Sequence, residues 1–478
     1  MSAPNVLLIC VDHWPGPLLR AAGHDHVFTP TLDQLCRNGV RFSQAYTTTP
    51  TCIPARRALM TGTSARTHGD RTFREHEPMD PSLPTMAQTF RNAGYQAYAV
   101  GKLHVFPQRD RIGFDDVILN EEGRHHLGGG SDDYERYLHD HGYGGQELTH
   151  AMGNNSYTVR PWHLPEQFHQ TYWTTRQMCE TIRRRDPGRP AFWYCSYAAP
   201  HPPITPPADY LRHYEHFGVD EPFVGDWARD FDALPHALKL HRGRRNDDLD
   251  GDETRAARMG FYAQCTYIDH QIRLLVGQLR EAGLLDDTIL MFTSDHGDML
   301  GNHHLWAKPP MYEHSANVPM ILFGTAGDAR VGARRTDGRL AALRDVMPTL
   351  LDLCGIDVPP TVEGESLVGE PRRTHLYCEH HEGAAAMRML RRGRYKLIYY
   401  PAGNRLQLFD VEGDPQELHD LYGSPATADV AGEMEALMAG ELYGEDRAWV
   451  RDGCLAGMPE PAYEYQPDRG LSGQRGWR

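Results

Sequence analysis

The chain has 478 residues, of which 24% are charged and 40% hydrophobic, as is usual for a soluble globular protein with room for more than one domain. Its formal net charge of −15 argues against a nucleic-acid-binding surface, so an anionic ligand would need a local cationic pocket. The nine cysteines show no paired spacing, the first residues form no secretory signal, and no apolar run could span a bilayer. We therefore expect a cytoplasmic protein with reduced thiols and without membrane or nucleic-acid partners.

The first predicted element is a strand over residues 5–11, a short apolar run that is typical of a strand buried on both faces. It ends at Asp12 and His13. Because ligands of open α/β sheets bind beyond the carboxyl ends of the strands, Asp12 is a candidate functional residue. The plainer interpretation is that Asp12 only begins a turn. A helix over 31–38 and a strand over 40–42 follow.

The stretch over residues 49–62 is the most informative part of the sequence. Pro50 and Pro54 restrict the backbone on both sides of Cys52, and Pro54 suits the first turn of a helix that runs to the end of this stretch. Cys52 would then lie at a helix N-terminus, where free N–H groups favour an anion, and Arg56 would face the same site one turn later. The alternative is a buried, inert cysteine beside a helix start.

Three further predicted strands also end in polar residues. The strands cover 96–100, 191–197 and 288–293, and they lead into Lys102 and His104, His201, and Asp295 and His296, respectively. An open α/β sheet places such strand ends along one edge, so we expect these side chains to share a site with Asp12. Taken singly, Lys102 would more often be a solvated loop cation, and a histidine a satisfied surface or core residue.

The remaining pattern indicates a main domain and a smaller C-terminal part. Further elements of the main domain are predicted over 86–93, 166–185, 254–282, 317–323 and 343–355. Gly- and Asn-rich residues 120–165 predict an irregular insertion that covers the pocket and helps to set substrate choice, or else a disordered surface loop. The basic run over 239–245 is interpreted as a solvated face.

Short strands after residue 370 predict a small antiparallel sheet, with members over 376–379, 386–390 and 396–400. We therefore expect a catalytic domain over 1–370 and a C-terminal subdomain over 371–478. The tail after Gly453 is either irregular or a contact between subunits of a homo-oligomer.

Several of these segments resemble one family. The run Cys52-Ile53-Pro54-Ala55-Arg56, the Gly-Lys-x-His at 101–104, the Pro-His-x-Pro at 200–203 and the Ser-Asp-His-Gly that opens 294–308 are similar to motifs of the type I, formylglycine-dependent sulfatases of the alkaline phosphatase superfamily. The resemblance implies an α/β, alkaline-phosphatase-like sandwich with a central, mostly parallel sheet and a smaller C-terminal antiparallel subdomain. It also implies hydrolysis of small anionic sulfate esters.

The same resemblance implies a cofactor and a set of site residues. Cys52 would be converted to formylglycine (3-oxoalanine) by a formylglycine-generating or an anaerobic sulfatase-maturating enzyme. One divalent cation, Ca²⁺ in preference to Mn²⁺ or Mg²⁺, would be held by Asp12, Asp295, His296 and the oxygen of residue 52. The implied catalytic residues are Cys52, Arg56, Lys102, His104, His201 and Lys308, of which Lys102, His201 and Lys308 also contact substrate. The roles of His13 and His303 are left open.

In the implied reaction, a hydroxyl of hydrated formylglycine attacks sulfur with Asp295 as the base, and His201 or Lys308 protonates the leaving alcohol. His104 then removes the proton of the second hydroxyl, which releases the sulfate. Phosphonate monoester hydrolases also have a histidine at the motif position of His296. One alternative is therefore a phosphonate monoester or phosphodiester hydrolase on the same scaffold. Another is a non-catalytic anion-binding protein in which Cys52 is never modified.

Overall fold

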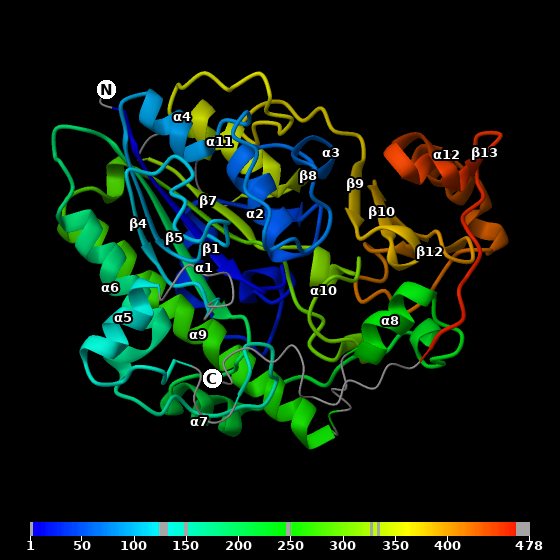
Figure 1. Cartoon of the computed structure of the whole chain (residues 1–478), viewed down its shortest axis with the longest axis horizontal. Coiled ribbons are helices and arrows are strands. Elements are labelled where there is room, and N and C mark those ends of the chain that lie inside the picture. Colours follow the sequence, from blue (N-terminus) through cyan, green and yellow to red (C-terminus); the bar gives the residue numbers. More distant parts are fainter. Residues whose placement is uncertain are drawn as a thin grey trace.

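The computed structural model describes residues 3–122, 124, 132–147, 152–244, 249, 251–325, 328–331 and 335–464. Its main sheet has eight strands in the order β4-β3-β5-β1-β6-β7-β2-β8 (Figure 1). Only β7 runs antiparallel to its neighbours. The strands are β1 Asn5–Asp12, β2 Val40–Tyr46, β3 Gln96–Gly101, β4 Asp116–Leu119, β5 Ala191–Pro200, β6 Thr288–Ser294, β7 Met320–Phe323 and β8 Arg335–Ala342.

Helices cover both faces of this sheet, because alternate side chains of each strand point in opposite directions. In β1, Val6 and Leu8 belong to one hydrophobic cluster, whereas Leu7 and Ile9 belong to the other. The first cluster is completed by α2 Cys52–Thr61, α4 Met86–Asn92 and α11 Val346–Leu353. The second is completed by α1 Pro30–Asn38, α6 Gln170–Arg183 and α9 Gly251–Glu281.

A second, antiparallel sheet of four strands lies beside the main domain (Figure 1). Its order is β12-β11-β10-β9, with bounds β9 Leu376–His380, β10 Met387–Arg392, β11 Tyr395–Tyr400 and β12 Arg405–Asp410. The helix α12 (Ala428–Glu441) packs on it, and β13 (Val450–Arg451) pairs with β14 (Cys454–Leu455). The remaining helices are α3 Ala65–His68, α5 Asp133–Asp140, α7 Ala208–Phe217, α8 His236–Arg244 and α10 Glu313–Ala316.

The expected fold class is therefore confirmed, while some local predictions were wrong. The insertion over 120–165 contains the helix α5, whose start is capped by the Asp132 side chain; its residues 123, 125–131 and 148–151 lie outside the described residues. The helix predicted over 166–185 is interrupted, because His169 adopts an extended conformation and caps α6. The basic run over 239–245 is not a solvated face: up to Arg242 it lies in α8 and is half-buried, and Arg245 lies outside the described residues. The domain division at residue 370 stays a prediction.

Candidate active site

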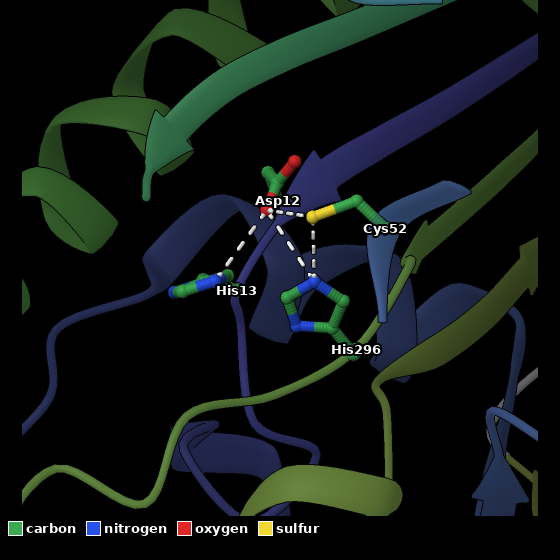
Figure 2. Close-up of side chains that lie close together, drawn as sticks. All are labelled: Asp12, His13, Cys52 and His296. Atoms are coloured by element: carbon green, nitrogen blue, oxygen red, sulfur yellow. Dashed lines mark hydrogen bonds and ion pairs between the residues drawn. The ribbon is translucent and has the colours of Figure 1, made fainter. Parts of the chain in front are cut away.

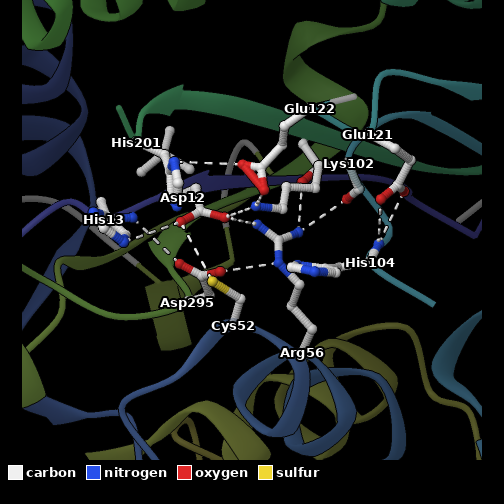
Figure 3. A network of polar contacts seen from close by, with 12 residues as sticks. Asp12, His13, Cys52, Arg56, Lys102, His104, Glu121, Glu122, His201 and Asp295 are labelled. Carbon is white, nitrogen blue, oxygen red and sulfur yellow. Dashed lines mark hydrogen bonds and ion pairs between the residues drawn. The ribbon is translucent and has the colours of Figure 1, made fainter. Parts of the chain in front are cut away.

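The carboxyl ends of the central parallel strands bring the predicted site residues together. Asp12 ends β1, Lys102 follows β3, His201 follows β5 and Asp295 follows β6. All four side chains are at most 5% exposed. Figure 3 shows them around one centre, together with Cys52 and Arg56 from the first turns of α2.

Cys52 lies at the centre of this group because it is the first residue of α2. Thr51, the residue before the helix, is extended, and Gly62 ends the helix in the left-handed conformation that favours glycine. The Cys52 Sγ atom lies 3.1 Å from His296 Nε2 and 3.9 Å from Asp12 Oδ1 (Figure 2). Burial raises the pKa of the Cys52 thiol to about 12, and the nearby Asp12 carboxylate adds to this effect.

The donor atoms around Cys52 suit a divalent cation. One atom each from Asp12, His13, Cys52 and His296 lies within 4.8 Å of the others. His296 Nδ1–H donates to the Gly297 carbonyl over 2.9 Å, so Nε2 carries the lone pair that a metal needs. Carboxylate oxygens suit Ca²⁺, Mg²⁺ or Mn²⁺, and the imidazole nitrogen adds one borderline donor.

Asp295 borders this group of donors. Its Oδ1 atom accepts the backbone N–H of His296 over 2.9 Å and of His13 over 3.3 Å, and it lies 3.7 Å from His296 Nε2. Burial, strengthened by the Asp12 carboxylate, raises the pKa of Asp295 to about 7. The raised pKa of Asp295 beside the Asp12 carboxylate is a further feature that a bound cation would relieve.

Arg56 ties both carboxylates to the strand ends. Its Nε donates to Asp295 Oδ2 over 2.9 Å, and its Nη2 donates to Asp12 Oδ2 over 3.2 Å. Its Nη1 donates to the Lys102 carbonyl and to Ser196 Oγ, both over 2.9 Å. The guanidinium is 3% exposed and holds the two acids in fixed orientations.

Lys102 is fully buried between two carboxylates. Its Nζ lies 2.5 Å from Asp12 Oδ2 and 2.8 Å from Glu122 Oε1. Burial alone would lower the pKa of Lys102, but the two carboxylates outweigh burial and raise it. In Asp12, burial opposes ionisation, but Lys102, His201 and Arg56 hold the pKa well below its usual range.

His104 lines the site, and its ring nitrogens are unpaired among the described residues. The ring is 3% exposed. The backbone is fixed instead, since the Glu121 carboxylate accepts the N–H groups of Leu103 and His104. Burial, together with Arg124 and Lys102, lowers the pKa of His104 well below its usual range, so the ring is neutral and able to accept a proton.

His13 lies against the cluster, and both of its ring nitrogens are engaged. Nδ1–H donates to Asp298 Oδ2 over 3.1 Å, and Nε2 accepts from the half-buried Lys308 ammonium. Asp298 also accepts the Tyr157 hydroxyl and the backbone N–H of Ala307. His13 therefore holds the Lys308 ammonium beside the group around Cys52.

His303 is the predicted site residue that does not reach this group. Its Nδ1 accepts the backbone N–H of Gly225 over 3.0 Å, and its ring packs against Phe223, Trp227 and Tyr312. This surrounding is apolar and buried, so His303 supports the loop that follows the Ser-Asp-His-Gly motif.

A pocket of about 610 Å³ opens onto Cys52. Its floor includes Cys52, His104, His201 and Lys308, while α8 and the second sheet form part of its wall through residues such as His241 and His380. Phe73, which is 42% exposed, stands edge-on to His104 at this pocket.

The sequence analysis missed Glu121, Glu122 and Asp298. The available signal for the first two was an acidic pair that follows a short strand after one intervening residue, at the sheet edge where ligands bind. For Asp298 the signal was its place two residues after His296.

Comparison with known proteins decides the family. Residues 4–356 match the Sulfatase family. The chain belongs to the sulfatase family, as the sequence motifs indicated. Residues 301–442 of this sulfatase also match the C-terminal region described for N-sulphoglucosamine sulphohydrolase.

Two relatives of this sulfatase are similar over nearly their whole length. An arylsulfatase of Clostridium perfringens is 32% identical over 479 residues, which cover 95% of this chain and 98% of the relative. A choline-sulfatase of Rhizobium meliloti is 30% identical and covers 97% and 94%, respectively. The sulfatase is thus an enzyme that hydrolyses sulfate esters. Among solved structures, a phosphonate monoester hydrolase of Agrobacterium radiobacter has a TM-score of 0.78 at 23% identity, covers 95% of this chain and 99% of that chain, and shares the fold.

Proposed function

We propose that this sulfatase acts through a hydrated formylglycine at position 52, beside one divalent cation. The observation that carries the proposal is the position of Cys52 Sγ among Asp12, His296 and the charged groups of the strand ends. Burial favours the protonated form of an unmodified thiol at this place, and a protonated thiol is a poor nucleophile. A geminal diol would instead offer one oxygen to the cation and one to the substrate.

Asp12, Asp295, His296 and the oxygen of residue 52 would hold the cation, and Ca²⁺ is favoured by the hard oxygen donors. Bound there, the cation would lower the pKa of the diol and hold one oxygen of the sulfate group. His13 is left out of this set, because its ring nitrogens are engaged by Asp298 and Lys308.

The protein residues would then divide the remaining tasks. Arg56, Lys102 and Lys308 spread positive charge around the transferred group. Asp295 is placed to accept the proton of the attacking hydroxyl, and His201 or Lys308 to protonate the leaving alcohol. The neutral His104, whose ring nitrogens are unpartnered among the described residues, is the base that removes the second hydroxyl proton and so expels sulfate.

Position 52 provides the direct test. The protein is produced with a formylglycine-generating or an anaerobic sulfatase-maturating enzyme, and the peptide containing residue 52 is weighed by mass spectrometry. We expect the aldehyde in wild type. Cys52→Ser should complete at most one turnover and retain a covalent sulfate adduct, because a serine ester has no second hydroxyl to expel it. Cys52→Ala, which has no oxygen at this position, should form no adduct. Sustained turnover by Cys52→Ser, or an intact thiol in all active protein, would refute the proposal.

A phosphonate monoester hydrolase remains the second candidate, because His296 is compatible with that activity as well. Comparison of kcat/KM for 4-nitrophenyl sulfate and for a 4-nitrophenyl phosphonate monoester separates the two. We expect the sulfate to be preferred; a clear preference for the phosphonate would assign the second activity instead.

A further inference from the structure

One carboxylate in the substrate pocket is unexpected. The Glu122 side chain is 9% exposed and lines the pocket, next to the groups proposed to bind a negatively charged ester. A negative charge at this place repels the substrate, and its burial costs free energy unless it is paired. The contacts of Glu122 therefore have to account for its presence.

Glu122 contacts two of the proposed catalytic residues at once. Its Oε1 lies 2.8 Å from Lys102 Nζ, and its Oε2 lies 3.4 Å from His201 Nδ1 (Figure 3). His201 and Lys102 in turn hold the pKa of Glu122 below its ordinary value, although burial opposes this. Burial lowers the pKa of His201 to about 4, and the Glu122 carboxylate is the largest influence that opposes this lowering. The carboxylate thus bridges the ends of β3 and β5.

The two ring nitrogens of His201 have different surroundings. Nδ1 lies 2.6 Å from the Pro202 carbonyl in addition to its contact with Glu122, so it faces two acceptors and carries a proton. No described residue forms a hydrogen bond with Nε2, and the ring lines the pocket. Nε2 is therefore the nitrogen that can meet the substrate.

We propose that Glu122 is a positioning residue for protonation of the leaving group. Nδ1–H donates to the Pro202 carbonyl, and the nearby Glu122 charge stabilises the imidazolium form of His201, whose Nε2–H serves the leaving oxygen. Glu122 also fixes Lys102 beside the sulfate. When the S–O bond breaks, its electron pair stays on the leaving oxygen, which takes the Nε2 proton. The ring is left neutral with its Nδ1 proton, and Nε2 regains a proton from water. This inference rests on the proposed sulfate-ester hydrolysis.

The acidity of the leaving alcohol determines which esters should lose most activity when the proton donor is impaired. A 4-nitrophenolate ion leaves without help, whereas phenol and aliphatic alcohols need a proton as the bond breaks. Loss of a residue that supports the proton donor must therefore harm poor leaving groups more than good ones. Loss of a residue that serves only folding or general charge harms all esters equally.

The experiment compares kcat/KM for 4-nitrophenyl sulfate, phenyl sulfate and an alkyl sulfate in enzyme whose formylglycine content is confirmed by mass. Glu122→Gln keeps the size of the side chain and removes its charge. We expect a loss within about tenfold for the nitrophenyl ester and on the order of a hundredfold or more for the other two. His201→Asn should give the same pattern, and the double variant should lose little more than either single one. Glu122→Asp, which keeps the charge, should recover part of the loss.

Glu382 supplies a matched control. It lines the same pocket but pairs with Arg71 and Arg74 instead of His201 or Lys102. Glu382→Gln should change kcat/KM by a similar factor for every ester.

Two failures can be told apart. If confirmed wild-type enzyme hydrolyses none of the esters, the proposed function fails and this inference fails with it. If wild type is active but Glu122→Gln loses the same factor for every ester, or adds fully to His201→Asn, only the role of Glu122 is overturned. Should Glu122→Gln have a lowered thermal midpoint, Glu122→Asp decides by the same pattern of leaving-group dependence.

Discussion

At the scale of single residues, the site depends on buried charges that compensate one another. Asp12, Asp295 and Lys102 are fully buried, and Arg56 is nearly so. Each would be costly alone, and only their mutual contacts make the arrangement stable. Arg56, one turn after Cys52 in α2, contributes to this compensation by pairing with both Asp12 and Asp295.

The geometry of the Arg56 guanidinium can be tested while its charge is kept. Arg56→Lys retains a cation but cannot reach Asp12, Asp295 and the strand-end oxygens together, so we expect the free energy of unfolding to fall by about 2–4 kcal/mol. Arg57→Lys is the control on the same helix, since the polar partners of the Arg57 side chain among the described residues are Asp70 and the Glu77 carbonyl. Its expected cost is about 1 kcal/mol. Equilibrium urea unfolding of both variants checks the difference, and equal costs would contradict it.

At the scale of elements, the turns that follow the strands position the catalytic side chains. Hydrophobic periodicity predicts the strands but not the geometry of these turns. Gly101 ends β3 with φ of +103°, and a Cβ atom there would lie 1.8 Å from the Ser196 carbonyl oxygen of β5. This close approach brings Lys102 into the same layer as Asp12. The helix predicted over 166–185 is likewise interrupted by a local conformation, because the backbone of His169 is extended.

His169 provides a pH-dependent test of one element. Its Nδ1 accepts the Thr171 N–H at the start of α6, and Nε2–H donates to the Thr205 carbonyl, so the buried ring must be neutral. Burial lowers the pKa of His169 from 6.5 to about 4. Folding therefore favours the neutral form of His169. Its contribution to the free energy of unfolding is fully present above pH 6.5 and is lost as the pH falls toward 4.

His169→Asn keeps a residue that caps helices well and removes the titration. Between neutral pH and pH 4 the unfolding free energy of wild type should fall by up to roughly 3 kcal/mol more than that of the variant. Urea unfolding over this pH range measures the two slopes. His139→Asn, at a side chain that is 83% exposed, is the control and should follow wild type. Parallel curves for wild type and His169→Asn would show that His169 does not titrate in this way.

At the scale of the whole molecule, the second sheet completes the substrate pocket. His380 of β9 lies 3.2 Å from Thr51 Oγ1, directly beside Cys52, and the Glu379 N–H donates to the Thr48 carbonyl. Buried Lys396 of β11 pairs with Glu313 over 2.6 Å and so joins the second sheet to α10 of the main domain. Within the described residues, no helix is both long and apolar enough to cross a membrane. The cytoplasmic location and a homo-oligomer stay predictions.

Metal binding should be visible in the stability of the entire fold. A cation that binds only the folded protein, at a free concentration of a hundred times its Kd, adds about 2.7 kcal/mol to the free energy of unfolding. We expect chelation by EDTA to lower the thermal midpoint and Ca²⁺ to restore it better than Mg²⁺ or Mn²⁺. In Asp295→Asn, which removes one proposed ligand charge, the midpoint should respond little to any of the three cations. An unchanged midpoint of wild type in EDTA and Ca²⁺ would contradict the proposed site.

The sequence by itself determined the family, the α/β fold with its smaller antiparallel sheet, and the strand ends that carry Asp12, Lys102, His201 and Asp295. These features are encoded locally, in apolar runs, prolines and short motifs. Only the tertiary structure decided that Glu122 meets His201, that Asp298 holds His13, that His303 stays outside the site and that α8 is half-buried at the pocket. Such contacts join residues from separate elements, and their formation depends on how the sheet and its connections close, which no local pattern records.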